Sequence, residues 1–276
     1  MSFNVLVSTR FFDAAAEQLL RDNDCKIIKS GLPYDVQDDT LSTAQLHSLL
    51  EGVDGWVVGT VQVTDELMRA HPRLKVIARR GVGYNNVDIK AAQALNKHVT
   101  IASGGNEAAV ADHAVAFFLS LAKKLNESHQ ALQQGRWSTF VSTELFEKTV
   151  GLIGFGRIAR GVTKRVKGFD ANVLAYDPFA DEKTVSAHGA KLTSLEDLLA
   201  RSDYVSLHLP YSKETRHLIN AERLAQMKKG SFIINTARGG LIDEAALLDA
   251  LTSGHIAGAG LDVFENEPDL QDPVVK

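Results

Sequence analysis

The chain has 276 residues, 45% hydrophobic and 23% charged, which predicts about two domains and excludes the disordered and fibrous classes. A formal charge of −4, with no basic block, argues against nucleic acid as the main partner. The single cysteine, Cys25, excludes an intrachain disulfide and a multi-cysteine metal site, as is typical of proteins in a reducing compartment.

The first 103 residues alternate short β-rich runs with longer amphipathic stretches, which is the pattern of βα units on a parallel sheet. Helices are predicted over residues 11–20 and 64–71, the second with Thr64 as its N-cap. The amino terminus has no basic region before its short apolar run, so no secretory signal is expected and a cytoplasmic location is predicted. The predicted strands of this part cover residues 4–8, 25–30, 54–59, 75–79 and 98–102.

Residues 106–125 are predicted to form one long helix that crosses between two domains. Its apolar stretch, residues 108–122, is interrupted by Asp112 and His113 and is shorter than the ~20 residues of a membrane span, so no membrane partner is expected. The helical spacing is carried by Val110, Ala114, Phe117, Phe118 and Leu121. A second α/β series follows, with predicted strands over residues 149–154, 172–177, 204–209, 231–236 and 257–264.

The strongest local signal is the run 150–159, in which a strand leads into the pattern G-x-G-x-x-A. Gly154 permits the tight turn, Gly156 lets a pyrophosphate approach the main chain, and the helix that starts at Arg157 offers its N-terminal N–H groups to that anion. Asp177 ends the next strand, where it can accept hydrogen bonds from a ribose and would repel a 2′-phosphate. The pattern predicts an NAD(H) site, with a glycine turn that binds nothing as the alternative.

Six segments, in order along the chain, resemble the D-isomer-specific 2-hydroxyacid dehydrogenases, a family that includes D-lactate, glycerate and 3-phosphoglycerate dehydrogenases. The resemblance covers nearly the whole chain, and six motifs in family order are more specific than any one of them. It implies an α/β protein with two parallel sheets: a flavodoxin-like substrate domain over residues 1–103 and a Rossmann NAD-binding domain over residues 104–276. The segments are residues 79–88, 106–117, 154–161, 208–220, 235–251 and 261–268.

The resemblance also implies the residues of the site. The loop Gly81-Val82-Gly83, which can expose consecutive N–H groups, is implied to hold the substrate carboxylate. Asn85 stands close by, where an aspartate is common in the family. Asp262 resembles the residue that binds the nicotinamide carboxamide, and no metal is expected. The implied cofactor-binding residues are Gly154, Gly156, Arg157, Ile158, Asp177, His208, Thr236, Ala237 and Asp262.

Two residues are predicted to be catalytic. Arg238 follows a predicted strand at the edge where open α/β sheets bind ligands, and its planar guanidinium suits the carboxylate and carbonyl of a 2-oxo acid. A structural ion pair is the alternative, but the family's catalytic arginine falls on this position. Glu267 matches the family's catalytic carboxylate, which orients a histidine and raises its pKa. Glu265, two residues earlier, is expected to be a solvated surface side chain.

The family's catalytic histidine lies in a T-P-H segment shortly after the E-P dipeptide, and no T-P-H segment occurs in these 276 residues. His113, His208 and His255 are expected to have structural rather than catalytic roles. The sequence is therefore expected to be part of a somewhat longer protein, with the returning segment of the substrate domain beyond it.

The expected function is hydride transfer between NAD(H) and a small D-2-hydroxy acid or its 2-oxo acid, by a homodimeric enzyme. One alternative is the 3-phosphoglycerate dehydrogenase of serine synthesis. Residues 57–62 lack the arginine that such enzymes commonly carry, although Arg80 could supply a replacement charge. The other alternative is a catalytically silent module that resembles the NADH-sensing corepressors of this fold. Arg238 and Glu267, both at family positions, favour the enzyme.

Overall fold

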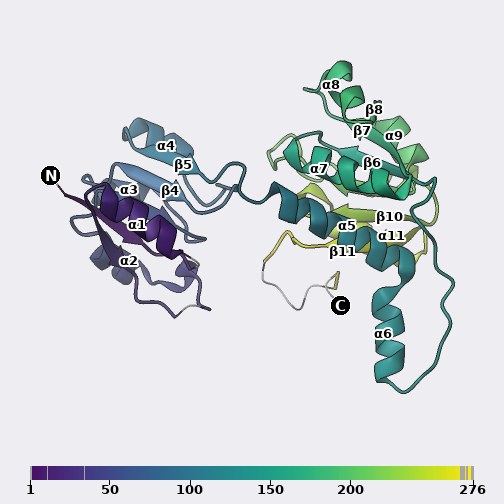
Figure 1. Cartoon of the computed structure of the whole chain (residues 1–276), viewed down its shortest axis with the longest axis horizontal. Helices are drawn as coiled ribbons and strands as arrows, with labels where there is room; N and C mark the ends of the chain where they lie inside the picture. Colours follow the sequence, from purple (N-terminus) through teal and green to yellow (C-terminus); the bar gives the residue numbers. More distant parts are fainter. Residues whose placement is uncertain (1, 11, 34, 268–270, 272, 275–276) are drawn as a thin grey trace. The chain divides into compact units, whose positions relative to one another are not determined.

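The computed structural model describes residues 2–10, 12–33, 35–267, 271, 273 and 274. The chain divides into two compact units, Met1–Asn106 and Glu107–Lys276. Each unit contains one sheet in which every strand pairing is parallel (Figure 1). The expected α/β fold with two parallel sheets is confirmed.

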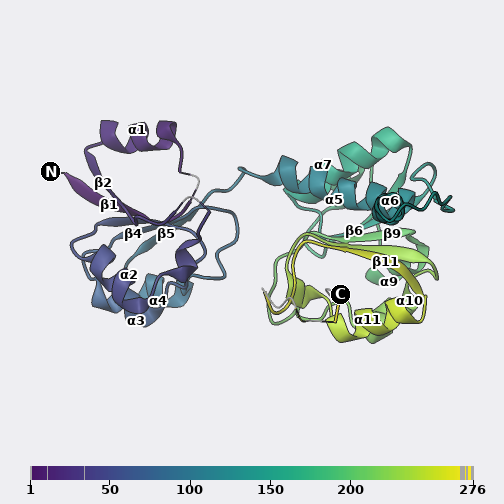
Figure 2. The same cartoon turned by 90° about the horizontal axis from the view of Figure 1, so that it is seen from below.

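The first unit has a five-stranded sheet in the order β2-β1-β3-β4-β5, which is the flavodoxin-like order. All of its predicted strands are present within one residue of the expected bounds: β1 (Phe3–Val7), β2 (Cys25–Lys29), β3 (Gly55–Val58), β4 (Val76–Arg79) and β5 (His98–Ile101). Figure 2 shows α1 (Ala14–Asp22) on one face of the sheet and, on the other face, α2 (Thr43–Leu50), α3 (Asp65–Ala70) and α4 (Ile89–Ala94).

The core of the first unit lies between the sheet and α2, α3 and α4. Leu6, Trp56 and Ile77, one from each of three neighbouring strands, are fully buried there. The helix starts follow local capping rules: the Thr64 hydroxyl accepts a hydrogen bond from the main-chain N–H of Leu67 (3.2 Å), which confirms the predicted N-cap of α3.

A buried carboxylate lies between the ends of β1 and β3. Asp38, only 1% exposed, begins the short 3₁₀ helix η1 (Asp38–Thr40). Its two oxygens accept hydrogen bonds from the main-chain N–H groups of Gly59 (2.6 Å), Thr60 (2.6 Å) and Val61 (3.1 Å). The Ser8 hydroxyl, at the end of β1, donates a further one at 2.7 Å. Asp38 therefore fixes the turn that follows β3.

The second unit has a six-stranded sheet in the order β11-β10-β9-β6-β7-β8. Counted within the unit, this is the Rossmann order 3-2-1-4-5-6. The strands are β6 (Thr149–Ile153), β7 (Asn172–Tyr176), β8 (Lys191–Leu192), β9 (Tyr204–Leu207), β10 (Ser231–Asn235) and β11 (Ile256–Leu261). The two-residue β8 is not predicted by the sequence. The predicted last strand is too long, because its neighbour β10 ends at Asn235, which is paired with Leu261.

Helices cover both faces of this sheet, with α5 and α7 on one side and α9, α10 and α11 on the other (Figure 2). The helix predicted over residues 106–125 is present as α5, but its predicted end is too late. The first helix ends at Lys123, because Lys124 adopts the left-handed conformation (φ +52°), and a second helix follows. The helices are α5 (Glu107–Lys123), α6 (Leu125–Gln133), α7 (Arg157–Val166), α8 (Glu182–Ala187), α9 (Leu195–Arg201), α10 (Ala221–Gln226) and α11 (Glu244–Thr252).

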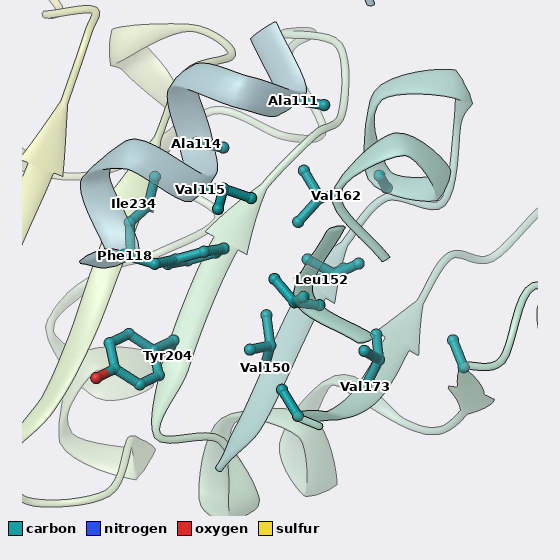
Figure 3. Close-up of a cluster of buried hydrophobic side chains, with 14 of the residues drawn as sticks. Ala111, Ala114, Val115, Phe118, Val150, Leu152, Val162, Val173, Tyr204 and Ile234 are labelled. Carbon is teal, nitrogen blue, oxygen red and sulfur yellow. The ribbon is translucent and has the colours of Figure 1, made fainter. Parts of the chain in front are cut away.

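The apolar face predicted for the first of these helices packs onto the sheet. Figure 3 shows Ala114 and Phe118 of α5 facing Val150 of β6 and Tyr204 of β9. The rings of Phe118 and Tyr204 meet edge to face, with their centroids 5.7 Å apart. Among the described residues, no helix is both long enough and apolar enough to cross a membrane.

Candidate functional site

The predicted cofactor residues of the second unit follow the carboxyl ends of its strands. In this sheet β6 and β9 are neighbours, although β7 and β8 come between them in sequence. Such a reversal of strand order is where open α/β sheets bind ligands. The glycine turn follows β6 and His208 follows β9, so the structure places both of them at this point.

The glycine turn has the geometry that a bound pyrophosphate needs. Gly154 has φ +89° and lies against the main chain of His208. Gly156 is the N-cap of α7, which starts at Arg157 as predicted, and no side chain caps the helix at that position. A Cβ atom on Gly156 would meet nothing within 4 Å, so there is open space in front of the helix N-terminus, where an anion is favoured.

Asp177 connects the glycine turn to the chain that follows β7. Its Oδ2 accepts a hydrogen bond from the N–H of Phe155 and its Oδ1 accepts one from the N–H of Phe179, both at 2.8 Å. A carboxylate has about four acceptor positions, so Asp177 can still accept hydrogen bonds from ribose hydroxyls. Residues 178–180 contain no basic side chain that could receive a 2′-phosphate.

Two buried polar atoms at this edge, Nδ1 of His208 and Oγ1 of Thr236, have no hydrogen-bond partner in the part of the chain that the structure describes. The other ring nitrogen of His208 lies 2.9 Å from Ser206 Oγ. Burial lowers the pKa of His208 to about 4, so its imidazole is neutral at pH 7. Unsatisfied buried polar groups are rare in folded proteins, which makes both atoms candidates for ligand contacts.

These features fit a dinucleotide such as NAD. The space in front of Gly156 is open, and the Cβ atom of any other residue at this position would fill part of it. Asp177 lies at the end of the strand next to that turn, and the two unpartnered atoms lie at the ends of the next strands on the other side. A metal is not suggested: the described residues contain no group of three or more His, Cys, Asp or Glu side chains that could hold one.

Arg238 lies in the short connection between β10 and the 3₁₀ helix η3 (Gly239–Leu241). The Asn235 side chain fixes this connection, because its Nδ2 donates to the Arg238 carbonyl (2.9 Å) and its Oδ1 accepts from the Ala237 N–H (3.0 Å). The half-buried guanidinium donates through Nη1 to the Ala237 carbonyl at 2.5 Å. The main chain of Arg238 is therefore held in place by the protein itself.

The segment after β11 rests directly on the residue after Arg238. A Cβ atom on Gly239 would lie 1.9 Å from the Phe264 carbonyl carbon, so only glycine permits this approach. Glu267 comes three residues later, and its Oε1 accepts a hydrogen bond from the Phe264 N–H at 2.6 Å. The structure thus brings the two predicted catalytic residues, Arg238 and Glu267, onto adjoining segments. Pro268 of the E-P dipeptide lies outside the described residues.

Asp262 follows β11 immediately, and its N–H donates to the Asn235 carbonyl (3.0 Å). Its exposed carboxylate lies 3.3 Å from Nε2 of His113, which α5 brings to the same edge of the sheet. No local pattern predicts this pairing, since α5 and β11 are far apart in the chain. His255, by contrast, donates to the Leu224 carbonyl (3.0 Å) in a purely structural contact.

Glu265 is exposed, as expected of a surface side chain, but it also forms two ion pairs that were not predicted. Its Oε2 lies 3.0 Å from Nε2 of His217 and its Oε1 lies 3.1 Å from Nη2 of Arg216. The segments 208–220 and 261–268 are recognisable in the sequence, but the pairing between them is not. The pairing could have been suspected from charge, because one motif carries the acidic Glu265 and the other carries the basic Arg216 and His217.

In the first unit, the loop Gly81-Val82-Gly83 follows β4, and the chain before and after it is tied to the turn that follows β3. Arg79 donates through Nε to Asn86 Oδ1 (3.2 Å). The Nδ2 of Asn86 in turn donates to the carbonyls of Gly59 (3.2 Å) and Val61 (2.8 Å). Arg79 and Asn86 thus connect the predicted substrate loop to the turn fixed by Asp38. Neither residue was singled out from the sequence.

Residues 115–276 match the family model described as D-isomer specific 2-hydroxyacid dehydrogenase, NAD binding domain. The matched part includes all predicted site residues of the second unit. The family resemblance inferred from the six motifs and the expected NAD-binding domain are therefore confirmed.

Individual proteins that are similar to this chain have the names of dehydrogenases and reductases of 2-hydroxy and 2-oxo acids. The D-3-phosphoglycerate dehydrogenase of Mycobacterium bovis is 45% identical over 233 residues, which are 83% of this chain and 44% of that protein. The chain spans about half the length of the curated relatives it matches. A glyoxylate reductase structure from Paecilomyes thermophila has a TM-score of 0.87 and 30% identity over 99% of this chain and 85% of that one. A D-lactate dehydrogenase from Aquifex aeolicus, complexed with NAD and lactic acid, has a TM-score of 0.81 and 34% identity over 97% and 79%.

Proposed function

We propose that this chain interconverts a small D-2-hydroxy acid and the matching 2-oxo acid with NAD(H), because it belongs to the D-isomer-specific 2-hydroxyacid dehydrogenase family. The observation that carries the proposal is the close packing of the Phe264–Glu267 segment on Gly239. This packing sets Arg238 and Glu267 on adjoining segments at the sheet edge that also holds the glycine turn.

Each proposed substrate contact follows from the chemistry of the groups. The Arg238 guanidinium donates to the carboxylate and the carbonyl oxygen of the 2-oxo acid, and it stabilises the negative charge that develops on that oxygen. The N–H groups of the loop Gly81-Val82-Gly83 are proposed, from the family resemblance, to bind a substrate carboxylate. Glu267 orients the imidazole that donates the proton, as the family resemblance implies. The bound cofactor supplies or accepts the hydride.

The proposed cofactor contacts come from the second unit. The N–H groups at the start of α7 bind the pyrophosphate, Asp177 accepts hydrogen bonds from the adenosine ribose, and Asp262 receives the carboxamide of the nicotinamide. The two unpartnered atoms of His208 and Thr236 are available to the nicotinamide half. The full proposed set is Gly154, Gly156, Arg157, Ile158, Asp177, His208, Thr236, Ala237 and Asp262.

The test follows NADH absorbance with glyoxylate, hydroxypyruvate, pyruvate and 3-phosphohydroxypyruvate, after fluorescence titration has established NADH binding. Consumption of NADH that depends on Arg238 supports the dehydrogenase. A form carried on through a T-P-H segment that binds NADH and turns over none of the four acids would overturn the proposal and favour the silent, corepressor-like module.

A second candidate substrate is 3-phosphoglycerate, which the names of the curated relatives favour. Against it, residues 57–62 contain no arginine, and Asp38 places a carboxylate at the turn that ends this stretch. The same assay decides between the two, because a phosphoglycerate dehydrogenase would show its highest kcat/KM with the phosphorylated acid.

We also propose a cytoplasmic homodimer. Cys25 is a free thiol, which supports a reducing compartment. Figure 1 shows α6 extending from the body of the second unit. On the chain that follows it, Trp137 is 90% and Val141 is 92% exposed, and such apolar side chains often lie in protein interfaces. Sedimentation of the protein and of a Trp137→Ser, Val141→Ser double variant tests this: a dimer that the double variant converts to monomer is expected, and a wild-type monomer contradicts it.

A further inference from the structure

A group of charged side chains lies beside the segment that follows β11. Glu265 is at its centre, with Nε2 of His217 3.0 Å from one carboxylate oxygen and Nη2 of Arg216 3.1 Å from the other. On the other side of the imidazole, Nδ1 of His217 is 4.0 Å from Oδ2 of Asp243. We name the two ion pairs of Glu265, with His217 and with Arg216, the Glu265 clamp.

The histidine of the clamp is itself anchored next to the proposed site. His217 adopts φ +48°, which is uncommon for a residue other than glycine. In this conformation its N–H donates to the Gly240 carbonyl at 2.8 Å. Two residues further along, the N–H of Ile219 donates to the Leu241 carbonyl at 3.0 Å. The imidazole therefore projects from a chain that runs alongside η3, the turn that follows Arg238.

Glu265 is also held through its main chain. Its N–H donates to Oε1 of Glu244, the first residue of α11, at 2.7 Å. Beneath it lies Gly239, where a Cβ atom would come within 2.3 Å of the Glu265 nitrogen. Three parts of the second unit therefore converge on one exposed residue: the 216–217 loop, α11 and η3.

We infer that Glu265, His217 and Arg216 are positioning residues that seat the Phe264–Glu267 segment on Gly239 and so fix Glu267 relative to Arg238. None of the three has to touch the substrate in order to do this. Without the clamp, the segment would keep its main-chain contact with Gly239 and the hydrogen bond from the Glu265 N–H to Glu244, but the spacing between the two proposed catalytic side chains would vary. The inference rests on the proposed function, because the spacing between Arg238 and Glu267 matters only if both residues act on the substrate.

The test compares His217→Asn, Glu265→Gln and their combination with wild type. Asparagine tolerates positive φ, so His217→Asn removes the imidazole without straining the main chain. The matched controls are Glu214→Gln, in the same loop but outside the clamp, and His188→Asn, whose imidazole donates to the Thr184 carbonyl (2.8 Å) and meets the Phe155 ring edge to face. Neither control residue belongs to the proposed site.

Hydrogen–deuterium exchange of the peptide 262–267 measures whether the clamp holds the segment. The exchange rate should rise roughly threefold to tenfold in both single variants, since partly exposed ion pairs contribute modestly to local stability. The double variant should exchange no faster than the faster single variant, because the two residues act as one pair. Peptides from β10 and both control proteins should be unchanged. Unchanged exchange in the clamp variants would overturn the inference.

Binding of NADH, and of oxamate to the NADH complex, measures whether the clamp serves the site. Oxamate imitates a 2-oxo acid but is not reduced. Its affinity should fall roughly threefold to tenfold in the clamp variants, while NADH affinity stays within about twofold. Faster exchange without a loss of oxamate affinity would overturn the positioning role. A wild-type protein that binds NADH but no oxamate would instead contradict the proposed function, and the positioning role would fall with it.

Discussion

Gly154 and His208 meet through their main chains: a Cβ atom on Gly154 would stand 2.6 Å from the His208 carbonyl oxygen. This contact joins the turn after β6 to the end of β9, where the strand order reverses. The shape of the cofactor turn is therefore set by a strand some fifty residues away in sequence as well as by the local glycine pattern.

The two glycines of this turn should respond differently to alanine. Gly154→Ala introduces both a main-chain clash and an unfavourable φ, so it should lower the free energy of unfolding by about 2 kcal/mol or more. Gly156→Ala has no clash to relieve and should fold normally, yet its methyl group occupies the pyrophosphate space and should weaken NADH binding. Urea unfolding and fluorescence titration measure the two effects. Equal stability of the two variants would contradict the structure.

Asp177→Ala should narrow the preference for NADH over NADPH. The substitution removes both the ribose acceptor and the charge that repels a 2′-phosphate, so NADH affinity should fall about tenfold and NADPH affinity should fall less. Asp181→Ala is the control, because Asp181 caps α8 and has no proposed contact with the cofactor. A wild-type protein with equal affinity for both cofactors would refute the assignment.

In a form carried on through a T-P-H segment, Arg238→Lys should separate turnover from cofactor binding. Lysine retains the positive charge but cannot form two parallel hydrogen bonds, so kcat/KM should fall roughly 10²-fold, with NADH affinity nearly unchanged. Arg201→Lys, at the exposed end of α9, is the matched control. The measurements are NADH oxidation with glyoxylate and NADH titration, and wild-type turnover in Arg238→Lys would show that the site is misassigned.

His208 should make the protein less stable in acid. Its pKa is about 4 in the folded protein and about 6.5 in the unfolded chain, so the unfolded chain binds the proton first as the pH falls. The free energy of unfolding should therefore decrease by about 3 kcal/mol between pH 6.5 and 4 on this account. His208→Gln should remove that decrease, whereas His188→Gln should not. Urea unfolding at several pH values measures it, and parallel curves for wild type and His208→Gln would disprove the claim.

Residues 1–276 should bind NADH and reduce 2-oxo acids only slowly. No T-P-H segment occurs in them, and among the described residues no histidine bonds to Glu267. His208 is neutral at pH 7 and cannot serve as a strong acid there. Loss of a positioned general acid reduces the rate about 10²–10⁴-fold, and a form carried on through a T-P-H segment should recover that factor. Suppose that mass spectrometry shows the protein to consist of residues 1–276 and that it still turns over rapidly. His113 or a water would then have to be the proton donor.

The strands and the glycine turn could be predicted because their signals are local. A run such as 149–154 combines β-rich residues with a turn at a fixed spacing, and helix caps such as Thr64 act within three residues. The length of a helix or strand was less predictable where it depends on a segment that is distant in sequence. The end of β11 depends on where β10 stops, and the break at Lys124 comes from one residue in a left-handed conformation.

The parts of the site that could not be predicted are contacts between residues far apart in sequence. Glu265 and His217 are 48 residues apart. His113 lies on α5, at the start of the second unit, and Asp262 directly follows β11, near the end of that unit. Their residue types are ordinary for an exposed loop or helix, so only the folded chain shows that each pair meets. Gly239 was part of a noted motif, but the reason it must be glycine is a main-chain neighbour 25 residues away.

Asp38 has a consequence for how the first unit can recognise an anion. Three successive main-chain N–H groups after β3, at Gly59, Thr60 and Val61, form the kind of concave donor set that binds phosphate in other folds. Here the protein's own carboxylate already occupies it, so an incoming phosphate or carboxylate would first have to expel an internal competitor of the same sign. An anion that binds to the first unit is therefore expected to bind to the N–H groups that follow β4 rather than to the turn after β3.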